Sequence, residues 1–206
     1  MFAVYTYLAT TLIEVTKVSP ALIPVFLAVF GIGATLGNLF VPRFADRALM
    51  PTAGGILLFS AVALSVFPLA AGNPWALAAD VFAIGASVSL GAILQTRLMD
   101  VAGDAQALAA ALNHSAFNTA NALGPFLGGL AIREGLGWTS TGPVGAALAV
   151  LGFLIWIVAY RDAKSVPVDI SSGRKTASPE TPPARRAPPL APDDRSRSDA
   201  ARDPVA

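Results

Sequence analysis

Long apolar stretches alternate with short polar connections from Phe2 to Tyr160. Five of these stretches contain about 19 residues or more with hardly any charge, which is the length of helix that crosses a hydrocarbon layer of about 30 Å. They are 21–41, 53–71, 75–94, 107–132 and 142–160. Because backbone groups in lipid must find partners within their own segment, the pattern predicts membrane-spanning helices.

The first apolar stretch, Phe2–Ile13, is shorter than the others. It would form only about 18 Å of helix at 1.5 Å per residue, and Glu14 ends it. No basic flank precedes it and no small-residue cleavage site follows it, which argues against a signal peptide. We therefore predict an all-α integral membrane protein with six transmembrane helices, the first of them clipped at its N-terminus.

The composition changes after residue 161. The segment 162–206 contains half of the chain's 16 prolines, mixed with Arg, Asp and Ser. It has almost no large apolar residues with which to offset the entropy of ordering. We predict a membrane bundle over 1–161 and a disordered cytoplasmic tail over 162–206. Arg185 and Arg186 are candidates for contact with anionic lipid, although a merely solvated tail is the simpler interpretation.

The net charge and the cysteine content of the chain exclude several classes of function. The formal net charge of +1 gives no reason to expect a nucleic-acid partner. The chain has no cysteine and one histidine, so disulfides, thiolate metal sites and histidine clusters are excluded. We predict no metal and no cofactor. The sequence also lacks a catalytic serine elbow, a phosphate loop and paired mid-membrane carboxylates, so we predict that the chain is not an enzyme.

The distribution of basic residues predicts the orientation. One side of the membrane would hold twelve Lys and Arg residues, including Arg43, Arg47, Arg97 and those of the tail. The other side would hold two, Lys17 and Arg133. Because positive charge stays inside, both termini are predicted to be cytoplasmic, in agreement with an even number of spans.

Glycines are concentrated in the second and fifth spans, the middle spans of two groups of three. This placement is typical of two inverted three-helix repeats, the plan of many transporters. Ordinary close packing of helix backbones explains the same glycines without a repeat. The glycines are Gly31, Gly33, Gly37, Gly124, Gly128 and Gly129.

The end of the second span carries a compact charged group. Asp46 lies between Arg43 and Arg47, where its carboxylate could pair with a guanidinium or with a neighbouring helix N-terminus. Such a contact would latch one conformation of a rocking bundle. From the residues alone, a cytoplasmic anchor with an incidental acid is the simpler interpretation.

The fifth span has the most polar face. His114, Asn118, Asn121 and Pro125 follow the spacing i, i+4, i+7, i+11, which places them on one side of a helix. Polar side chains are costly in lipid, so this side is predicted to face a cavity. Hydrogen bonding between helices is the alternative. Pro125 removes a backbone donor and is a candidate hinge.

Asp80 is the acid that lies within a span. It follows Asn73-Pro74-Trp75, where Asn73 suits a helix cap and Trp75 the membrane interface. The position predicts a partly hydrated carboxylate near the outer surface. Asp80 is a candidate proton or ion site, and stabilisation by the helix N-terminus is the simpler alternative.

Several of these segments resemble the major facilitator superfamily of transporters. The segment 37–47 resembles the family's cytoplasmic loop signature. The segments 94–100 and 116–129 resemble drug:proton antiporters, and in particular sugar-efflux and chloramphenicol-efflux permeases of bacteria. The resemblance covers residues 2 to about 160 and aligns with the second six-helix half of a twelve-span transporter. It implies one bundle of a major facilitator fold.

The resemblance also implies roles for individual residues. The gating loop would comprise Gly37, Arg43, Asp46 and Arg47. Residues near the substrate would be Tyr5, Tyr7, His114, Asn118 and Asn121. The segment with Gly124, Pro125, Gly128 and Gly129 is similar to the antiporter motif, which the family carries in its first half, and would serve as a helix hinge and packing element.

The resemblance implies proton-coupled efflux of a drug or sugar by alternating access across the bacterial inner membrane. The expected partners are lipid, a small-molecule substrate, protons, and either the N-terminal six-helix half or a second copy of the chain. The alternative is a truncated or half-size membrane protein that does not transport on its own and needs a partner bundle.

Overall fold

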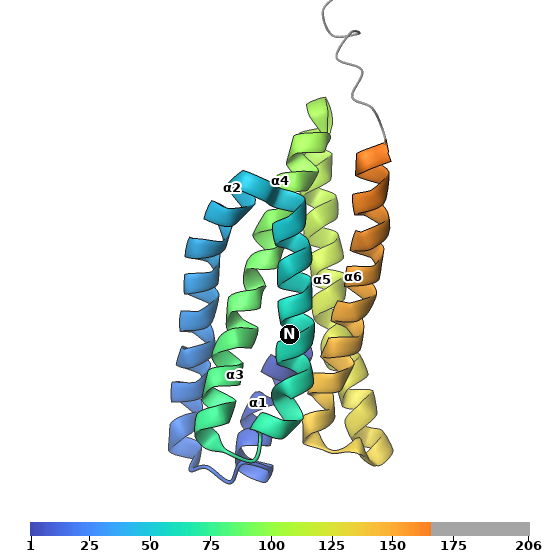
Figure 1. Cartoon of the computed structure of the whole chain (residues 1–206). Coiled ribbons are helices and arrows are strands. Elements are labelled where there is room, and N and C mark those ends of the chain that lie inside the picture. Colours follow the sequence, from blue (N-terminus) through green and yellow to red (C-terminus); the bar gives the residue numbers. More distant parts are fainter. Residues whose placement is uncertain (166–206) are drawn as a thin grey trace, which may run out of the picture. The chain divides into compact units, whose positions relative to one another are not determined.

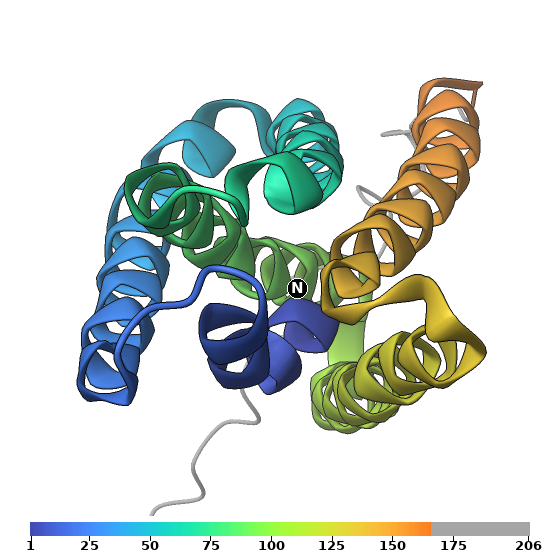
Figure 2. The ribbon, with the colours of Figure 1, turned by 90° about the horizontal axis from the view of Figure 1, so that it is seen from below.

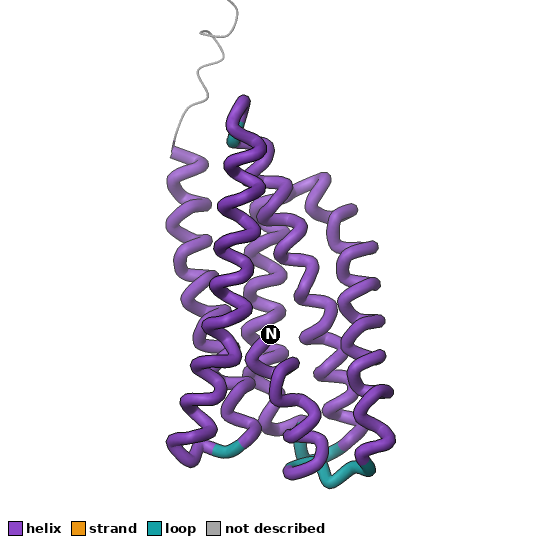
Figure 3. Tube along the Cα trace, turned by 180° about the vertical axis from the view of Figure 1, so that it is seen from behind, coloured by secondary structure: helices purple, strands orange, loops and turns teal. Residues whose placement is uncertain are grey.

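The computed structural model of the chain describes residues 1–165, and side chains up to Asp162. The predicted tail beyond Ser165, including Arg185 and Arg186, lies outside the described residues. Within the described part every regular element is helical, and Figure 3 shows helix along almost the whole trace. The prediction of an all-α membrane bundle is confirmed.

Within residues 1–165, six α-helices are joined by short turns of other helix types. The α-helices are α1 (Phe2–Glu14), α2 (Ile23–Ala70), α3 (Pro74–Ala86), α4 (Leu90–Val101), α5 (Gln106–Ala131) and α6 (Thr141–Ser165). The short elements are η1 (Pro20–Leu22), η2 (Ser87–Ser89), η3 (Gly103–Ala105), a π-helical turn η4 (Ile132–Leu136) and η5 (Trp138–Ser140). Helix α6 continues past the boundary predicted at residue 161.

Helix α2 contains two antiparallel rods, which correspond to the predicted second and third spans. Ala48 leaves the helical conformation at φ −156° and ψ 75°, and the chain reverses there, as the blue and cyan segments of Figure 1 show. Pro51 follows in the first turn of the second rod, where a missing N–H is tolerated. The predicted cytoplasmic turn is therefore a single break rather than a loop.

Helices α3 and α4 form one rod through η2. Asn73 caps its start, since its Oδ1 accepts hydrogen bonds from the backbone N–H groups of Trp75 at 2.9 Å and Ala76 at 3.3 Å. The predicted cap is thus confirmed. In η2 the hydroxyls of Ser87 and Ser89 donate to the carbonyls of Ile84 and Ala86 in α3, at 2.6 and 2.9 Å, which satisfies these hydroxyls inside the bundle.

In the part of the chain that the structure describes, three helical segments are long and apolar enough to cross a membrane: Pro20–Ala70, Pro74–Val101 and Trp138–Asp162. The first contains both rods of α2. Helix α1 has only 13 residues, and the polar face of α5 lowers its mean hydropathy. The count of six spans remains a prediction.

The main apolar cluster joins α1, both rods of α2, and α3. Its fully buried members include Leu8, Leu12, Leu64, Phe67 and Leu77. Seen from below, α1 lies between α2 and α3 on one side and α5 and α6 on the other (Figure 2). Helix α1 therefore connects the two sides of the bundle.

Candidate functional site

The polar face of α5 lies at the surface of the described bundle. His114 and Asn118 are exposed and Asn121 is half-buried. None of the three forms a hydrogen bond with another described residue. The alternative of hydrogen bonds between helices is therefore not realised within this part of the chain, and the three side chains are free to bind other groups.

His114 lies in a pocket of about 290 Å³ between α2, α4 and α5. Its polar side chains are three carboxamides and the imidazole, and none of the described Lys, Arg, Asp or Glu residues lines it. The lining residues are Asn38, Val88, Gly91, Ala92, Gln95, Asn113, His114 and Phe117.

The other residues expected near substrate do not share this pocket. Asn121 lines a mostly apolar pocket of about 230 Å³, and Tyr7 lines a third pocket of about 390 Å³ beside Trp138. The ring of Tyr5 packs against that of Phe30 at a tilt of 42°, with ring centroids 4.7 Å apart. In the described bundle Tyr7, His114 and Asn121 thus line three different pockets, and the cavity that they are expected to share stays a prediction.

Phe117 lines both the His114 pocket and the Asn121 pocket. Its ring meets the ring of Phe2 edge to face, with centroids 6.1 Å apart. A Cβ at Gly91 would lie 3.1 Å from the Phe117 ring, so glycine at this position gives the ring its space. Phe117 is therefore a fixed wall between the two pockets.

The candidate hinge segment of α5 packs on α1. The Tyr7 hydroxyl donates a hydrogen bond to the Pro125 carbonyl at 3.2 Å, and a Cβ at Gly129 would lie 2.5 Å from that hydroxyl. Gly124 and Gly128 face Ala3 of α1 at van der Waals distance. Predicted close packing is found here, while α5 stays helical through Pro125.

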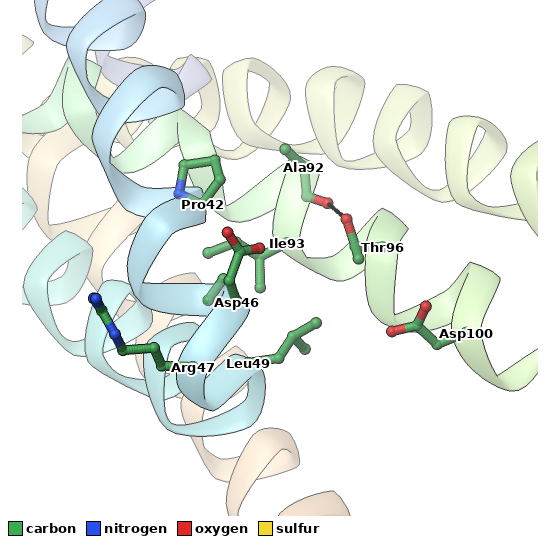
Figure 4. Close-up of a pocket in the computed structure, with 9 residues that line it drawn as sticks. Pro42, Asp46, Arg47, Leu49, Ala92, Ile93, Thr96 and Asp100 are labelled. Carbon is green, nitrogen blue, oxygen red and sulfur yellow. Dashed lines mark hydrogen bonds between the residues drawn. The ribbon is translucent and has the colours of Figure 1, made fainter.

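The predicted gating loop lines a pocket of about 320 Å³ between α2 and α4. Figure 4 shows Asp46 directed towards α4, where Thr96 and Asp100 contribute to the wall, whereas Arg47 points away from α4. The Thr96 hydroxyl donates to the Ala92 carbonyl at 3.0 Å. Asp46 therefore faces another helix, as a gating contact requires.

Asp46 does not pair with its neighbouring arginines. Arg43 donates to the Leu39 carbonyl, and its guanidinium lies 5.5 Å from the Phe40 ring centroid. An ion pair joins Lys17 and Glu14 at 3.9 Å instead. Gly37 allows the backbone of α2 to approach Ala86 of α3, because a Cβ there would clash with the Ala86 carbonyl.

Asp80 is buried, with 8% of its surface exposed, and its Oδ2 has no hydrogen-bond partner in the described part. The expectation of a partly hydrated carboxylate is wrong for this atom. Leu77 and Ile84, one turn before and one turn after it, are fully buried in the main apolar cluster. Because Leu77, Asp80 and Ile84 lie on the same side of α3, the packing that buries the two apolar residues also buries Asp80.

Sequence reasoning missed the helices that complete the pockets. Asn38 and Gln95 lie beside His114, and Thr96 and Asp100 lie opposite Asp46. These residues fall within the segments 37–47 and 94–100, but the sequence pattern does not indicate which side of α2 or α4 faces α5.

The helical bundle and its polar pockets define a multi-pass membrane protein. Comparison with known families then identifies it further: the chain belongs to the Major Facilitator Superfamily, whose family profile matches residues 1–203. No solved structure matches the chain.

Curated relatives are transport proteins. The chain is 34% identical over 162 residues to "Inner membrane transport protein YdhP" of Escherichia coli K12, covering 78% of this chain and 42% of that protein. It is 31% identical over 163 residues to a "Probable sugar efflux transporter" of Haemophilus influenzae, covering 77% of this chain and 40% of that protein. An "Uncharacterized MFS-type transporter YfhI" of Bacillus subtilis is 31% identical over 168 residues, covering 80% and 42%. The chain thus spans about two fifths of the length of these relatives.

Proposed function

We propose that this bundle forms one half of a transport pathway that exports a small molecule in exchange for protons. The observation that carries the proposal is the open polar face of α5, where His114 and Asn118 are exposed without internal partners. In a membrane such a face must be covered by protein or water. The relatives are transport proteins more than twice as long as their match to this chain, so a second six-helix bundle is the proposed cover.

Alternating access follows from that arrangement. A substrate held between two bundles becomes exposed to each side in turn when one bundle rocks against the other. The pocket with Asp46, Thr96 and Asp100 would open and close as α2 and α4 move at the predicted cytoplasmic end. The Pro125 segment would supply any bending that α5 needs.

Asp80 is the proposed proton or ion site of this half. A buried carboxylate without a partner is costly in its charged form, so its neutral form suits the described packing. Rocking that admits water to Asp80 would release the proton. Replacing Asp80 with Asn should abolish coupling to the proton gradient in the assembled transporter, measured as loss of gradient-driven efflux with retained substrate binding.

The second candidate function is a membrane protein that does not transport by itself. The same open face favours it, because one bundle supplies only part of a cavity wall. A second copy of the chain could cover the face, but it would duplicate one half of the chemistry and lack the other.

Transport assays with and without a partner bundle separate the two candidates. The purified chain in liposomes with an imposed proton gradient should export neither drug nor sugar, and co-reconstitution with an N-terminal six-helix bundle should restore export. Robust gradient-driven efflux by the chain alone would establish a self-sufficient half-size transporter. Failure of export in the assembled protein would reject the transport proposal.

The proposed location is the bacterial inner membrane with both termini in the cytoplasm. The excess of basic residues on one side supports this orientation, and a relative carries "inner membrane" in its name. Reporter fusions after Lys17, Asn73 and Ser140 should be active in the periplasm. Periplasmic activity of a fusion after Asp162 would reverse the orientation.

A further inference from the structure

The His114 pocket differs from the other polar pocket in its chemistry. The pocket beside Asp46 is lined by two carboxylate residues, Asp46 and Asp100, and is bordered by Arg47. The His114 pocket instead gathers Asn38, Gln95 and Asn113, from three different helices, and no Lys, Arg, Asp or Glu of the described part lines it. It is therefore the polar but uncharged pocket of the pair.

Carboxamides suit ligands that carry hydroxyl groups. Each one offers both an acceptor oxygen and two N–H donors, and an imidazole adds a further donor or acceptor. None of the four polar side chains is hydrogen-bonded to another described residue. A hydroxyl both donates and accepts, so several hydroxyls on one small ring can satisfy these groups together.

The apolar part of the pocket also fits such a ligand. Phe117 presents one aromatic ring, which packs against Phe2 and fits beside Gly91. The C–H face of a sugar ring packs on such an aromatic surface. The volume of about 290 Å³ lies near the lower end of ligand pockets, which span roughly 300–1,000 Å³. A lipophilic cation is disfavoured, because it would gain one ring and no carboxylate.

We propose that Asn38, Gln95, Asn113, His114 and Phe117 form a subsite for a neutral, hydroxyl-rich small molecule of monosaccharide size. The proposal rests on the proposed transport function for its biological use, but it concerns binding and can be tested on the chain alone. Phe117 sets the size of the ligand, since its ring separates this subsite from the Asn121 pocket.

The test is saturation-transfer NMR on the full chain in lipid nanodiscs, with D-glucose, D-mannitol and tetraphenylphosphonium as probes. The double variant Gln95→Leu/Asn113→Leu replaces two carboxamides with apolar groups of similar size and should weaken binding of the hydroxylated probes at least about tenfold. The control is Thr119→Val, which removes an exposed α5 hydroxyl that bonds only to the Ser115 carbonyl. It should bind as the unaltered chain does, and thermal unfolding confirms that each variant is folded.

A second variant tests the role of Phe117. Phe117→Ala joins the two pockets, so a disaccharide probe, sucrose, should bind this variant better than it binds the unaltered chain, while D-glucose binds less tightly. Unchanged selectivity between the two sugars would show that the ring does not set the ligand size and would contradict that part of the proposal.

Three results would overturn the subsite. They are equal sugar binding by the double variant and the unaltered chain, tighter binding of tetraphenylphosphonium than of either hydroxylated probe, and no binding of either hydroxylated probe by the folded chain. These results are independent of the transport assay. Sugar binding without export in the assembled protein would reject the transport proposal alone, whereas export of a charged compound without sugar binding would reject the subsite alone.

Discussion

The contact between α2 and α3 and the outer face of α5 are built in opposite ways. At the first, Gly33, Gly37 and Gly85 let two helix backbones touch, and a Cβ at any of them would clash with a backbone carbonyl of the opposite helix. At the second, His114 and Asn118 extend from α5 without internal partners. In the first region the contacting backbones leave no room for a side chain at these glycines. In the second region the polar side chains have hydrogen-bond donors and acceptors without partners in the described bundle.

The difference distinguishes residues that stabilise the bundle from residues that are available to bind other molecules. Backbone contact in lipid depends on van der Waals packing, since no hydrophobic force drives one apolar helix onto another. Polar groups left open in the same environment contribute little to the bundle's own stability. Substitutions in the two regions should therefore affect different measurements.

The largest effect is expected at Gly33. Gly33→Ala places a methyl group against the Phe82 carbonyl, and because a backbone cannot yield as a side chain does, α2 and α3 must separate. We expect a loss of about 1–3 kcal/mol, the usual cost of overpacking, measured by thermal unfolding in detergent or nanodiscs. Gly31→Ala is the matched control, since a Cβ there meets nothing within 4 Å. Equal destabilisation by both variants would show that the glycines act through helix flexibility and not through contact.

A side-chain contact between α6 and α2 should give a smaller effect that can be rescued. The Trp156 indole N–H donates to the Met50 carbonyl at 2.9 Å, beside the break at Ala48. A Cβ at Gly54 would lie 2.5 Å from that indole ring. Gly54→Ala should cost about 1–2 kcal/mol.

The rescue and the control define this second prediction. Trp156→Phe replaces the indole with a smaller ring and should reduce the loss of stability caused by Gly54→Ala, so that the effects of the two changes are not additive. Gly55→Ala, where a Cβ has open space, should have almost no effect. Additive losses in the double variant would mean that Gly54 and Trp156 do not interact in the folded bundle.

These comparisons also show what the sequence can predict. The Asn73 cap and the close packing at Gly33 and Gly37 follow from local chemistry, and the structure contains them. Gly31, which the sequence does not distinguish from its neighbours, is open. A glycine pattern identifies the helix that packs closely, but the rotation of that helix decides which glycines touch.

The site was less predictable for the same reason. The polar spacing along α5 predicts a shared side for His114 and Asn118, and both residues are exposed. It does not reveal that Asn38 and Gln95 join His114 while Asn121 falls behind Phe117, because those relations depend on three helices meeting. The burial of Asp80 was not predictable from its distance to the helix start, because it depends on Leu77 and Ile84, which lie on the same side of α3 and are buried.

One hydrogen bond links α5 to α1 and should give a modest effect. Tyr7→Phe removes the hydroxyl that donates to the Pro125 carbonyl, with an expected loss of about 0.5–1.5 kcal/mol. Tyr5→Phe is the control, because Tyr5 is partly exposed and packs through its ring on Phe30. Chemical denaturation of the two variants in parallel measures the difference. If Tyr5→Phe is the more harmful change, the hydroxyl of Tyr7 is not what holds α5 on α1.

The smallest effect is expected on the open face itself, and a reciprocal exchange isolates it. Asn118 and Leu112 are both exposed on α5 but on different sides of the helix. Asn118→Leu removes no internal bond, so stability should change by less than about 0.5 kcal/mol. Leu112→Asn would place a carboxamide against lipid and should destabilise the chain in nanodiscs, because polar groups are costly there. Thermal unfolding of both variants in the same lipid, each co-reconstituted with an N-terminal six-helix bundle, gives the comparison, because the polar face of the chain alone would itself meet lipid. If Asn118→Leu were clearly stabilising and Leu112→Asn neutral, Asn118 would be the lipid-facing residue, and the proposed cavity would lie on another side of α5.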